Sequence, residues 1–178
     1  QDLSEFRDLD SINGYHEMVE VKKLMTSEEM LTSLRKKSRD NSRTPMQWDD
    51  STNAGFSTGT PWIKVNPNYT EINAREQLQR PDSVFHYYQK LIQLRKQHEI
   101  IVYGKYELLD GTNPDVYAYT RALDNERLLI VCNFTSNELD YPIPEMYKDG
   151  SCLISNYPDN TIGNKLRPYE AYVLHIEL

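Results

Sequence analysis

The hydrophobic periodicity of the sequence changes near residue 100, and this change limits the possible folds more than any other feature. Before residue 100, apolar residues recur at the three- and four-residue spacing of helices. After it, short alternating segments end at turn residues such as Asp110-Gly111. We therefore expect an α+β chain, helical over residues 1–100 and folded as a small antiparallel β-sandwich over residues 101–178.

Individual elements can be placed within both regions. Helices are expected at residues 27–37, where the Thr26 hydroxyl can cap the first turn, and at residues 82–98. Pro142 and Pro144 direct one segment to a sheet edge, because proline lacks the amide that a strand ladder needs. The other strands are expected at residues 103–109, 116–121, 128–134, 151–156 and 171–178, with the very apolar 128–134 at the centre of the sheet.

Composition and charge exclude several classes of function. Hydrophobic residues make up 38% of the 178 residues, which is typical of folded proteins. A net charge of −7 disfavours binding to nucleic acid or to an anionic membrane. No apolar run is long enough to span a bilayer. The chain begins at Gln1, with neither an initial methionine nor a signal peptide, so we expect a fragment. Its two isolated cysteines fit a cytoplasmic setting best.

The cysteines and histidines give no sign of a metal or redox centre. Cys132 and Cys152 lie in separate apolar runs and are expected to be free thiols, although a disulfide between them stays open. The histidines lack the spacing of metal ligands and are assigned structural or surface roles: His16, His86, His98 and His175. We expect no cofactor and no metal.

Residues 38–81 form a long segment without periodicity that contains four prolines and two tryptophans. Irregular segments of this length in compact domains are typically functional or disordered. Because a solvated linker does not need tryptophans, we predict an ordered loop held by its aromatic rings. Within it, Arg39 and Arg43 stand four residues apart, next to carboxylates and Trp48. Such groups suit sugar hydroxyls and a sugar ring, and they equally suit internal ion pairs that only hold the loop.

The sequence from Arg39 to Trp48 resembles the RDNxRTPMQW signature of glycoside hydrolase family 13, in particular its oligo-1,6-glucosidases, dextran glucosidases, trehalose-6-phosphate hydrolases and related exo-acting α-glucosidases. The resemblance continues in register through later segments and covers nearly the whole chain. Residues 83–95 resemble the last helix of the family's barrel, and residues 166–171 resemble its closing strand motif.

The resemblance implies that residues 1–100 are the C-terminal part of a (β/α)8 barrel and residues 101–178 the β-sandwich that follows it. Family members are retaining hydrolases that need a carboxylate nucleophile and a carboxylic acid. The motifs that carry these acids, and a third acidic residue, are missing from the sequence. Asp40, Asp49 and Glu170 do not match them. We assign no catalytic residue and expect the fragment itself to be inactive.

The same resemblance implies a substrate-binding role for Arg43, which matches the arginine that reaches the non-reducing glucosyl unit. Arg39 is a weaker candidate and a better organiser of the loop, while Gln47 and Trp48 are expected to brace it. The implied partners are an α-gluco-oligosaccharide and the missing N-terminal barrel. Without that barrel, the exposed face of the helix at 82–98 favours self-association.

Two alternatives belong to other classes of function. One is a carbohydrate-binding β-sandwich without hydrolase activity, which would need several exposed aromatic side chains on one strand face. The tyrosines available for it are Tyr103, Tyr106, Tyr117, Tyr119 and Tyr172, and core packing is expected to account for most of them. The other alternative is a plain interaction domain without a ligand.

Overall fold

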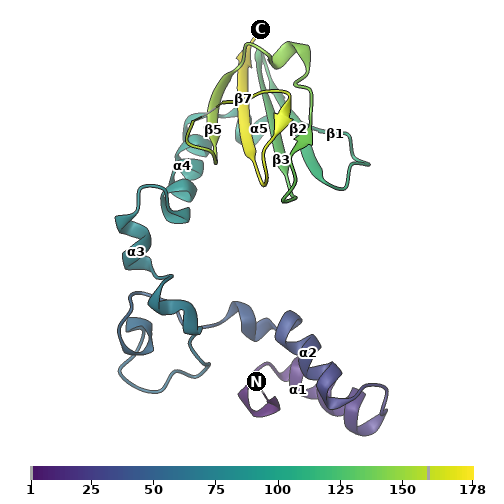
Figure 1. Cartoon of the computed structure of the whole chain (residues 1–178), viewed down its shortest axis with the longest axis vertical. Helices are drawn as coiled ribbons and strands as arrows, with labels where there is room; N and C mark the ends of the chain where they lie inside the picture. The colour runs from purple at the N-terminus through teal and green to yellow at the C-terminus, as the bar shows by residue number, and fades with distance from the viewer. Residues whose placement is uncertain (1, 160) are drawn as a thin grey trace. The chain divides into compact units, whose positions relative to one another are not determined.

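The computed structural model describes residues 2–159 and 161–178, which divide into two compact units between His86 and Tyr87 (Figure 1). The first unit holds short helices separated by loops. Its elements are η1 Leu3–Glu5, α1 Leu9–Tyr15, the π-helix η2 His16–Val21, α2 Ser27–Lys37, η3 Arg39–Ser42, η4 Thr52–Gly55, η5 Pro67–Thr70 and α3 Ala74–Gln79. Helix α4, Val84–Gln97, begins at the boundary.

Helix α2 has the bounds that the sequence predicted, and its ends show why. The Thr26 hydroxyl accepts from the amide of Glu29 at 3.3 Å, and the Glu29 carboxylate accepts from the amide of Thr26 at 2.8 Å. This reciprocal capping box satisfies two amides that a helix start leaves without partners. Leu34 is the buried residue of the helix. The last three residues, Arg35, Lys36 and Lys37, are basic, which suits the negative end of the helix dipole.

Helix α4 confirms the second predicted helix. The Ser83 hydroxyl accepts from the amide of His86 at 3.4 Å and donates to the carbonyl of Gln77 at 2.6 Å. None of the side chains of α4 is fully buried, and Phe85 and Tyr88 are well exposed. No helix within the described residues is both long enough and apolar enough to cross a membrane.

The second unit is built on a five-stranded antiparallel sheet with the strand order β1-β2-β3-β7-β5. A separate two-stranded sheet pairs β4 with β6. The strands are β1 Lys105–Leu109, β2 Val116–Leu123, β3 Glu126–Asn133, β4 Leu139–Asp140, β5 Ser151–Ser155, β6 Lys165–Leu166 and β7 Ala171–Glu177. The apolar strand β3 is central, as its composition predicted, and the two prolines follow the short strand β4, which pairs only with β6.

Successive side chains along each strand point to opposite faces of the large sheet. One face forms a buried core with the small sheet and with Tyr147 of the short helix η6, Glu145–Tyr147. The buried side chains of this core are Val116, Ala118, Leu129, Val131, Tyr147, Leu166, Tyr172 and Leu174. Cross-strand pairs such as Val131 with Tyr172 bring these side chains together. The antiparallel sandwich expected from the sequence is therefore confirmed.

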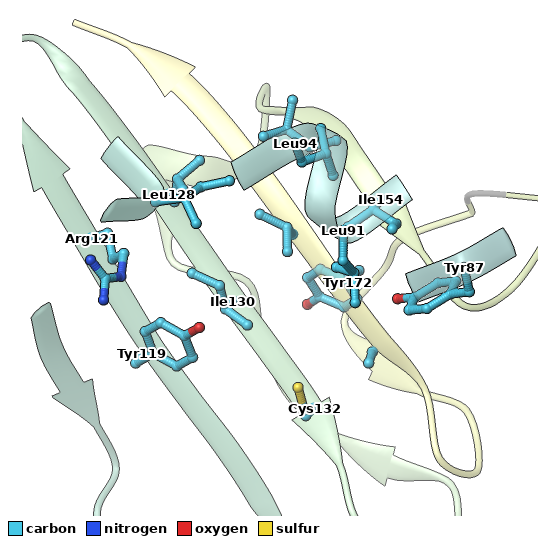
Figure 2. Close-up of a pocket in the computed structure, with 14 residues that line it drawn as sticks. Tyr87, Leu91, Leu94, Tyr119, Arg121, Leu128, Ile130, Cys132, Ile154 and Tyr172 are labelled. Carbon is cyan, nitrogen blue, oxygen red and sulfur yellow. The ribbon is translucent and has the colours of Figure 1, made fainter. Parts of the chain in front are cut away.

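The opposite face of the large sheet packs against α4 (Figure 2). Leu91 and Leu94 of α4 and Ile130 of β3 line a cavity of about 350 Å³ between the helix and the strands. Cys132 lies at this cavity, and it and Cys152 are free thiols that are partly buried. Burial raises the pKa of both thiols, so neither has the character of a reactive thiolate.

Two sequence-based expectations about the irregular regions were wrong. Residues 38–81 are ordered, but Trp48 and Trp62 are 54% and 57% exposed, so these two side chains do not hold the loop. Hydrogen bonds hold it instead, and part of it forms helix α3. A short helix, α5 Ile100–Tyr103, also occupies residues 101–103, where the β region was expected to begin, and Ile100 at its start is fully buried.

Candidate functional site

The two signature arginines lie at the start of η3 and immediately after it, directly downstream of α2. The Ser38 hydroxyl accepts from the amide of Asp40 at 3.3 Å and so begins the turn. The Asn41 side chain donates to the carbonyl of Arg35 at 3.0 Å, which satisfies an acceptor at the end of α2. The local sequence thus ends one helix and begins the next within two residues, which places Arg39 and Arg43 on a tightly held turn.

The buried carboxylate of Asp40 joins this turn to the N-terminal segment. Its Oδ2 atom accepts from the amide of Arg7 at 2.6 Å and from the amide of Asp8 at 3.0 Å. Amide hydrogen bonds to a carboxylate are among the stronger ones in proteins. The other oxygen, Oδ1, is buried and has no hydrogen-bond partner among the described residues. This acceptor atom of the site therefore lacks a donor among the described residues.

Asp8 is the carboxylate at the centre of the site. Its side chain is only 4% exposed, and its Oδ1 atom lies 2.6 Å from the guanidinium of Arg39 and 3.8 Å from that of Arg43. Oδ2 accepts from the hydroxyl of Ser11 at 2.9 Å, and the same carboxylate caps α1. Arg39 also pairs with Asp10 at 2.5 Å. Arg39 is therefore shared by two carboxylates, whereas Arg43 makes one longer ion pair.

The electrostatics of the site follow from this arrangement. Burial by itself would raise the pKa of Asp8, but hydrogen bonds from Arg39 and Ser11 outweigh burial and hold the pKa below its usual value. The hydrogen bond to Asp8 and the charge of Asp10 raise the pKa of Arg39. These shifts favour the ionised form of Asp8 and the charged form of Arg39. The half-exposed guanidinium of Arg43 keeps donors that can face a ligand.

The rest of the loop is fixed by amide side chains and by backbone groups. Gln47 donates through its side chain to the carbonyl of Ile72 at 2.5 Å, and its own carbonyl accepts from the amide of Ala74. Asn73 is buried and caps α3 by accepting from the amide of Glu76 at 3.0 Å. Gln47 and the backbone carbonyl of Trp48 thus supply acceptors for the first amides of α3, which agrees with the expectation that they brace the loop.

A left-handed turn follows the signature. Asn53, Ala54 and Gly55 all have positive φ angles, of 55°, 58° and 66°. A side chain at position 55 would collide with the Asp49 carboxylate, since a Cβ atom there would lie 2.8 Å from its Oδ1. The turn is stabilised by the Asn53 side chain, which donates to the carbonyls of Ser57 and Gly59. Position 55 therefore requires glycine for two reasons: its positive φ angle and the lack of room for a Cβ atom beside Asp49.

The other acidic residues considered in the sequence have partners of their own. Asp49 accepts from Ser51 and lies near Arg75, so it organises its own loop. Glu170, in the second unit, is 1% exposed and accepts from the amide and the guanidinium of Arg167. Both carboxylates have local structural partners. Asp8, in contrast, was missed by sequence analysis, although an aspartate three residues before Ser11 is a recognisable helix cap.

Two family models match the sequence of the chain. The family model "Alpha amylase, catalytic domain" matches residues 10–104, and "Alpha-amylase SusG C-terminal domain" matches residues 116–173. The first match covers more than half of the chain. The chain therefore belongs to the alpha-amylase family of glycoside hydrolases, and the resemblance based on the signature from Arg39 to Trp48 is confirmed.

Individual relatives align with almost the full length of this chain. The oligo-1,6-glucosidase of Parageobacillus thermoglucosidasius is 49% identical over 182 residues, covering 99% of this chain and 32% of the relative. The trehalose-6-phosphate hydrolase of Bacillus subtilis is 42% identical, covering 98% of this chain and 32% of the relative. The chain spans about a third of the length of the curated relatives it matches.

Solved structures also match almost the whole of this chain and about a third of their own length. The trehalulose synthase MutB from Pseudomonas mesoacidophila MX-45 matches with a TM-score of 0.93 at 40% identity, over 99% of this chain and 33% of that one. The trehalose-6-phosphate hydrolase of Bacillus licheniformis matches with a TM-score of 0.89 at 41% identity, with the same coverage. These names include both hydrolases and a synthase, so the fold alone does not select one reaction.

The depressed pKa of Asp8 predicts a specific pH dependence. A carboxylate with a lowered pKa in the folded state stabilises the protein above its unfolded pKa of about 3.9 and loses that contribution as the pH falls through the folded value. Asp8→Asn keeps a capping side chain but removes the charge. We expect it to be less stable than the parent chain at pH 7, with the difference shrinking below about pH 4.

Tryptophan fluorescence during urea unfolding measures this difference, because both tryptophans lie in the first unit. The matched control is Asp149→Asn, an exposed aspartate in the second unit, which should leave the fluorescence transition unchanged. A constant difference between Asp8→Asn and the parent from pH 7 to pH 3 would contradict the role assigned to the Asp8 charge.

Proposed function

We propose that this chain is the C-terminal third of a retaining, exo-acting α-glucosidase that hydrolyses α-glucosidic bonds of short oligosaccharides in the bacterial cytoplasm. In this proposal residues 1–100 complete the catalytic barrel and residues 101–178 form the following domain. Arg43 binds the terminal glucosyl unit. Arg39 belongs to the same substrate-binding site, where its main role is to hold the turn in position. Curated relatives named oligo-1,6-glucosidase, glucan 1,6-alpha-glucosidase and alpha-glucosidase support this class of substrate.

The observation that carries the proposal is the unequal use of the two arginines. Arg39 is held by Asp8 at 2.6 Å and Asp10 at 2.5 Å, whereas Arg43 lies 3.8 Å from Asp8 and is 45% exposed. An arginine that is anchored beside a buried carboxylate but keeps free donors is well placed to bind a sugar hydroxyl. Its charge is fixed in place before substrate binds, which lowers the entropic cost of binding.

Two features support the proposal that other parts of the enzyme complete the site. The buried Oδ1 atom of Asp40 has no donor among the described residues. The exposed apolar side chains of α4, including Phe85, Tyr88 and Ile92, offer a surface for the N-terminal barrel. In the absence of that barrel, the same surface favours self-association of the chain. The sequence lacks the motifs that carry the family's catalytic acids, so the 178 residues alone are proposed to be inactive.

A chimeric enzyme tests the role of Arg43. We expect the N-terminal two thirds of the oligo-1,6-glucosidase of Parageobacillus thermoglucosidasius, joined to this chain, to release glucose from isomaltose, whereas this chain alone does not. Arg43→Ala should lower kcat/KM of the chimera by about 100-fold, equivalent to loss of one charged hydrogen bond in a closed site. The matched control Lys36→Ala changes an exposed cation of α2 and should have little effect.

The outcomes of this experiment separate the parts of the proposal. Activity of the isolated chain would contradict its assignment as a non-catalytic part. A chimera that is active and unaffected by Arg43→Ala would exclude Arg43 from substrate binding while leaving the family role of the chain intact.

A second candidate function is glucan binding by the sandwich itself, and one observation favours it. Core packing was expected to account for most of Tyr103, Tyr106, Tyr117, Tyr119 and Tyr172, but of these five only Tyr172 is deeply buried, while Tyr106 and Tyr117 are 45% and 42% exposed. These two and Tyr119 form a tyrosine cluster on β1 and β2, with ring centroids 5.2 and 5.4 Å apart and a 3.1 Å hydrogen bond between the hydroxyls of Tyr106 and Tyr117. Exposed aromatic faces with hydroxyl groups suit sugar rings.

Calorimetric titration with maltooligosaccharides tests this second function. If the tyrosine cluster binds glucan, Tyr106→Ala should weaken binding by about fivefold or more, which is the loss typical of a central aromatic anchor. Tyr103→Ala, which removes an exposed tyrosine outside the cluster, is the matched control. Absence of any measurable heat for the parent chain would exclude the binding-module function.

A further inference from the structure

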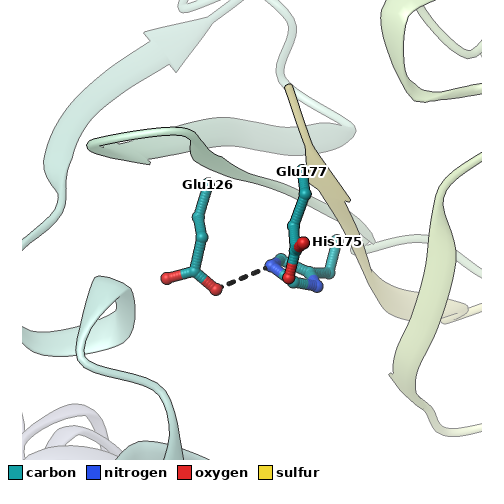
Figure 3. A group of neighbouring side chains, drawn as sticks. All are labelled: Glu126, His175 and Glu177. Carbon is teal, nitrogen blue, oxygen red and sulfur yellow. Dashed lines mark hydrogen bonds and ion pairs between the residues drawn. The ribbon is translucent and has the colours of Figure 1, made fainter.

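A second cluster of polar side chains lies far along the sequence from the arginine site, where β3 begins and β7 ends. Glu126 is the first residue of β3, and His175 and Glu177 lie near the end of β7. One ligand atom from each residue lies within 4.8 Å of the others. Figure 3 shows Glu126 bridged to the His175 ring, with the Glu177 carboxylate beside the same ring. We call these three residues the Glu-His-Glu cluster.

Sheet geometry explains why these side chains converge. Glu126 pairs directly with Glu177 across the antiparallel ladder. His175 and Glu177 are two residues apart on one strand and therefore share a face of the sheet. The Nε2 atom of His175 lies 2.9 Å from Oε1 of Glu126, and the His175 side chain is 12% exposed. The ligand atoms are thus held by two central strands rather than by a loop.

The charges of the cluster are not balanced by the protein. Two carboxylates that lie directly opposite each other across a ladder repel one another. The carboxylate of Glu177 has no hydrogen-bond or ion-pair partner among the residues that the structure describes. The neighbouring cation Arg127 donates to the backbone carbonyls of Asp124 and Glu126 instead. A single histidine cannot neutralise both carboxylates, whatever its protonation state.

The ligand set favours a particular kind of cation. One imidazole nitrogen and two carboxylates suit a borderline metal such as Zn²⁺ better than Mg²⁺ or Ca²⁺, which prefer oxygen ligands alone. Ligand atoms bound to one tetrahedral Zn²⁺ at about 2.0–2.1 Å are about 3.3 Å apart. His175 and Glu126 would therefore need to separate by only a few tenths of an ångström from their 2.9 Å contact.

The surroundings of His175 restrict the motion of its ring. The ring of His98, which follows α4, packs against it with centroids 5.9 Å apart at an interplanar angle of 62°. A ring that is held by packing keeps its nitrogen aimed at the same point, which is the usual function of groups around a metal ligand. His98 is in this way a positioning residue for the cluster.

From the converging ligand atoms, the unbalanced charge and the packed histidine, we propose that the Glu-His-Glu cluster binds one Zn²⁺ ion. Glu126, His175 and Glu177 are its ligands, and water fills the remaining coordination position. The ion fastens the start of β3 to the end of β7 and so stabilises the second unit. This inference does not depend on the proposed glucosidase function, because it concerns a different unit of the chain.

The test uses the whole 178-residue chain after treatment with a chelator. Isothermal titration with ZnCl₂ should show one site per chain, and saturating Zn²⁺ should raise the thermal midpoint of the second unit, because a ligand that binds the folded state stabilises it. MgCl₂ at the same concentration should do neither. No saturable binding of Zn²⁺ up to about 1 mM would overturn the proposal.

Substitutions separate a zinc site from a simple histidine–glutamate pair. Glu177→Gln removes one ligand without breaking any side-chain hydrogen bond or ion pair among the described residues, so it should fold at least as stably as the parent without metal. It should weaken Zn²⁺ binding at least about tenfold and reduce the zinc-induced rise of the midpoint. His175→Ala should abolish binding. Unchanged Zn²⁺ affinity in Glu177→Gln, with a normally folded variant, would overturn the proposal.

The matched control is His16→Ala. His16 and Glu20 form an exposed pair with the Nδ1 atom 2.7 Å from the carboxylate, but they have no second carboxylate that completes a metal-ligand group in the described chain. Zn²⁺ binding should be the same in His16→Ala as in the parent. Loss of the single site in this variant would place the ion on the His16 pair and refute its assignment to the Glu-His-Glu cluster.

Discussion

The buried Asp40 carboxylate is the interaction on which the geometry of the first unit depends. It binds the amides of Arg7 and Asp8 and so joins two segments that are more than 30 residues apart in the chain. Through this link the Asp8 carboxylate meets Arg39 and Arg43. Few large side chains of this unit are buried, so directional hydrogen bonds, rather than a large apolar core, determine where the arginines lie.

The second unit is stabilised differently, and its fold was the easier part to predict. The alternating pattern of β7 places Tyr172 and Leu174 in the core, and the apolar composition of β3 predicts its central position. These properties are local in sequence. The buried turn at Ile100 was not predictable in this way, because its burial depends on strands that follow it in the chain. The prediction that aromatic rings hold the long loop was wrong for the same reason, since the exposure of Trp48 and Trp62 is a property of the fold.

The candidate site residues also differ in how far they could be predicted from local sequence. The signature made Arg39 and Arg43 candidates for substrate binding because both lie within one continuous block. Asp8 was missed, since its proximity to them depends on the Asp40 link. His175 was assigned a structural or surface role because the histidines lack the spacing of metal ligands. Its proximity to Glu126, 49 residues away, arises only from the sheet register. Sequence spacing finds sites built within one segment, whereas sites built across strands or through buried polar bridges need the fold.

The claim that Asp40 organises the arginine site can be measured directly by hydrogen exchange at the amides of Arg7 and Asp8. Both amides donate to the buried carboxylate, so they should exchange much more slowly than in an unstructured peptide, and Asp40→Ala should remove this protection from both. Exchange of these two amides in the parent chain at the rate of an unstructured peptide would contradict the account.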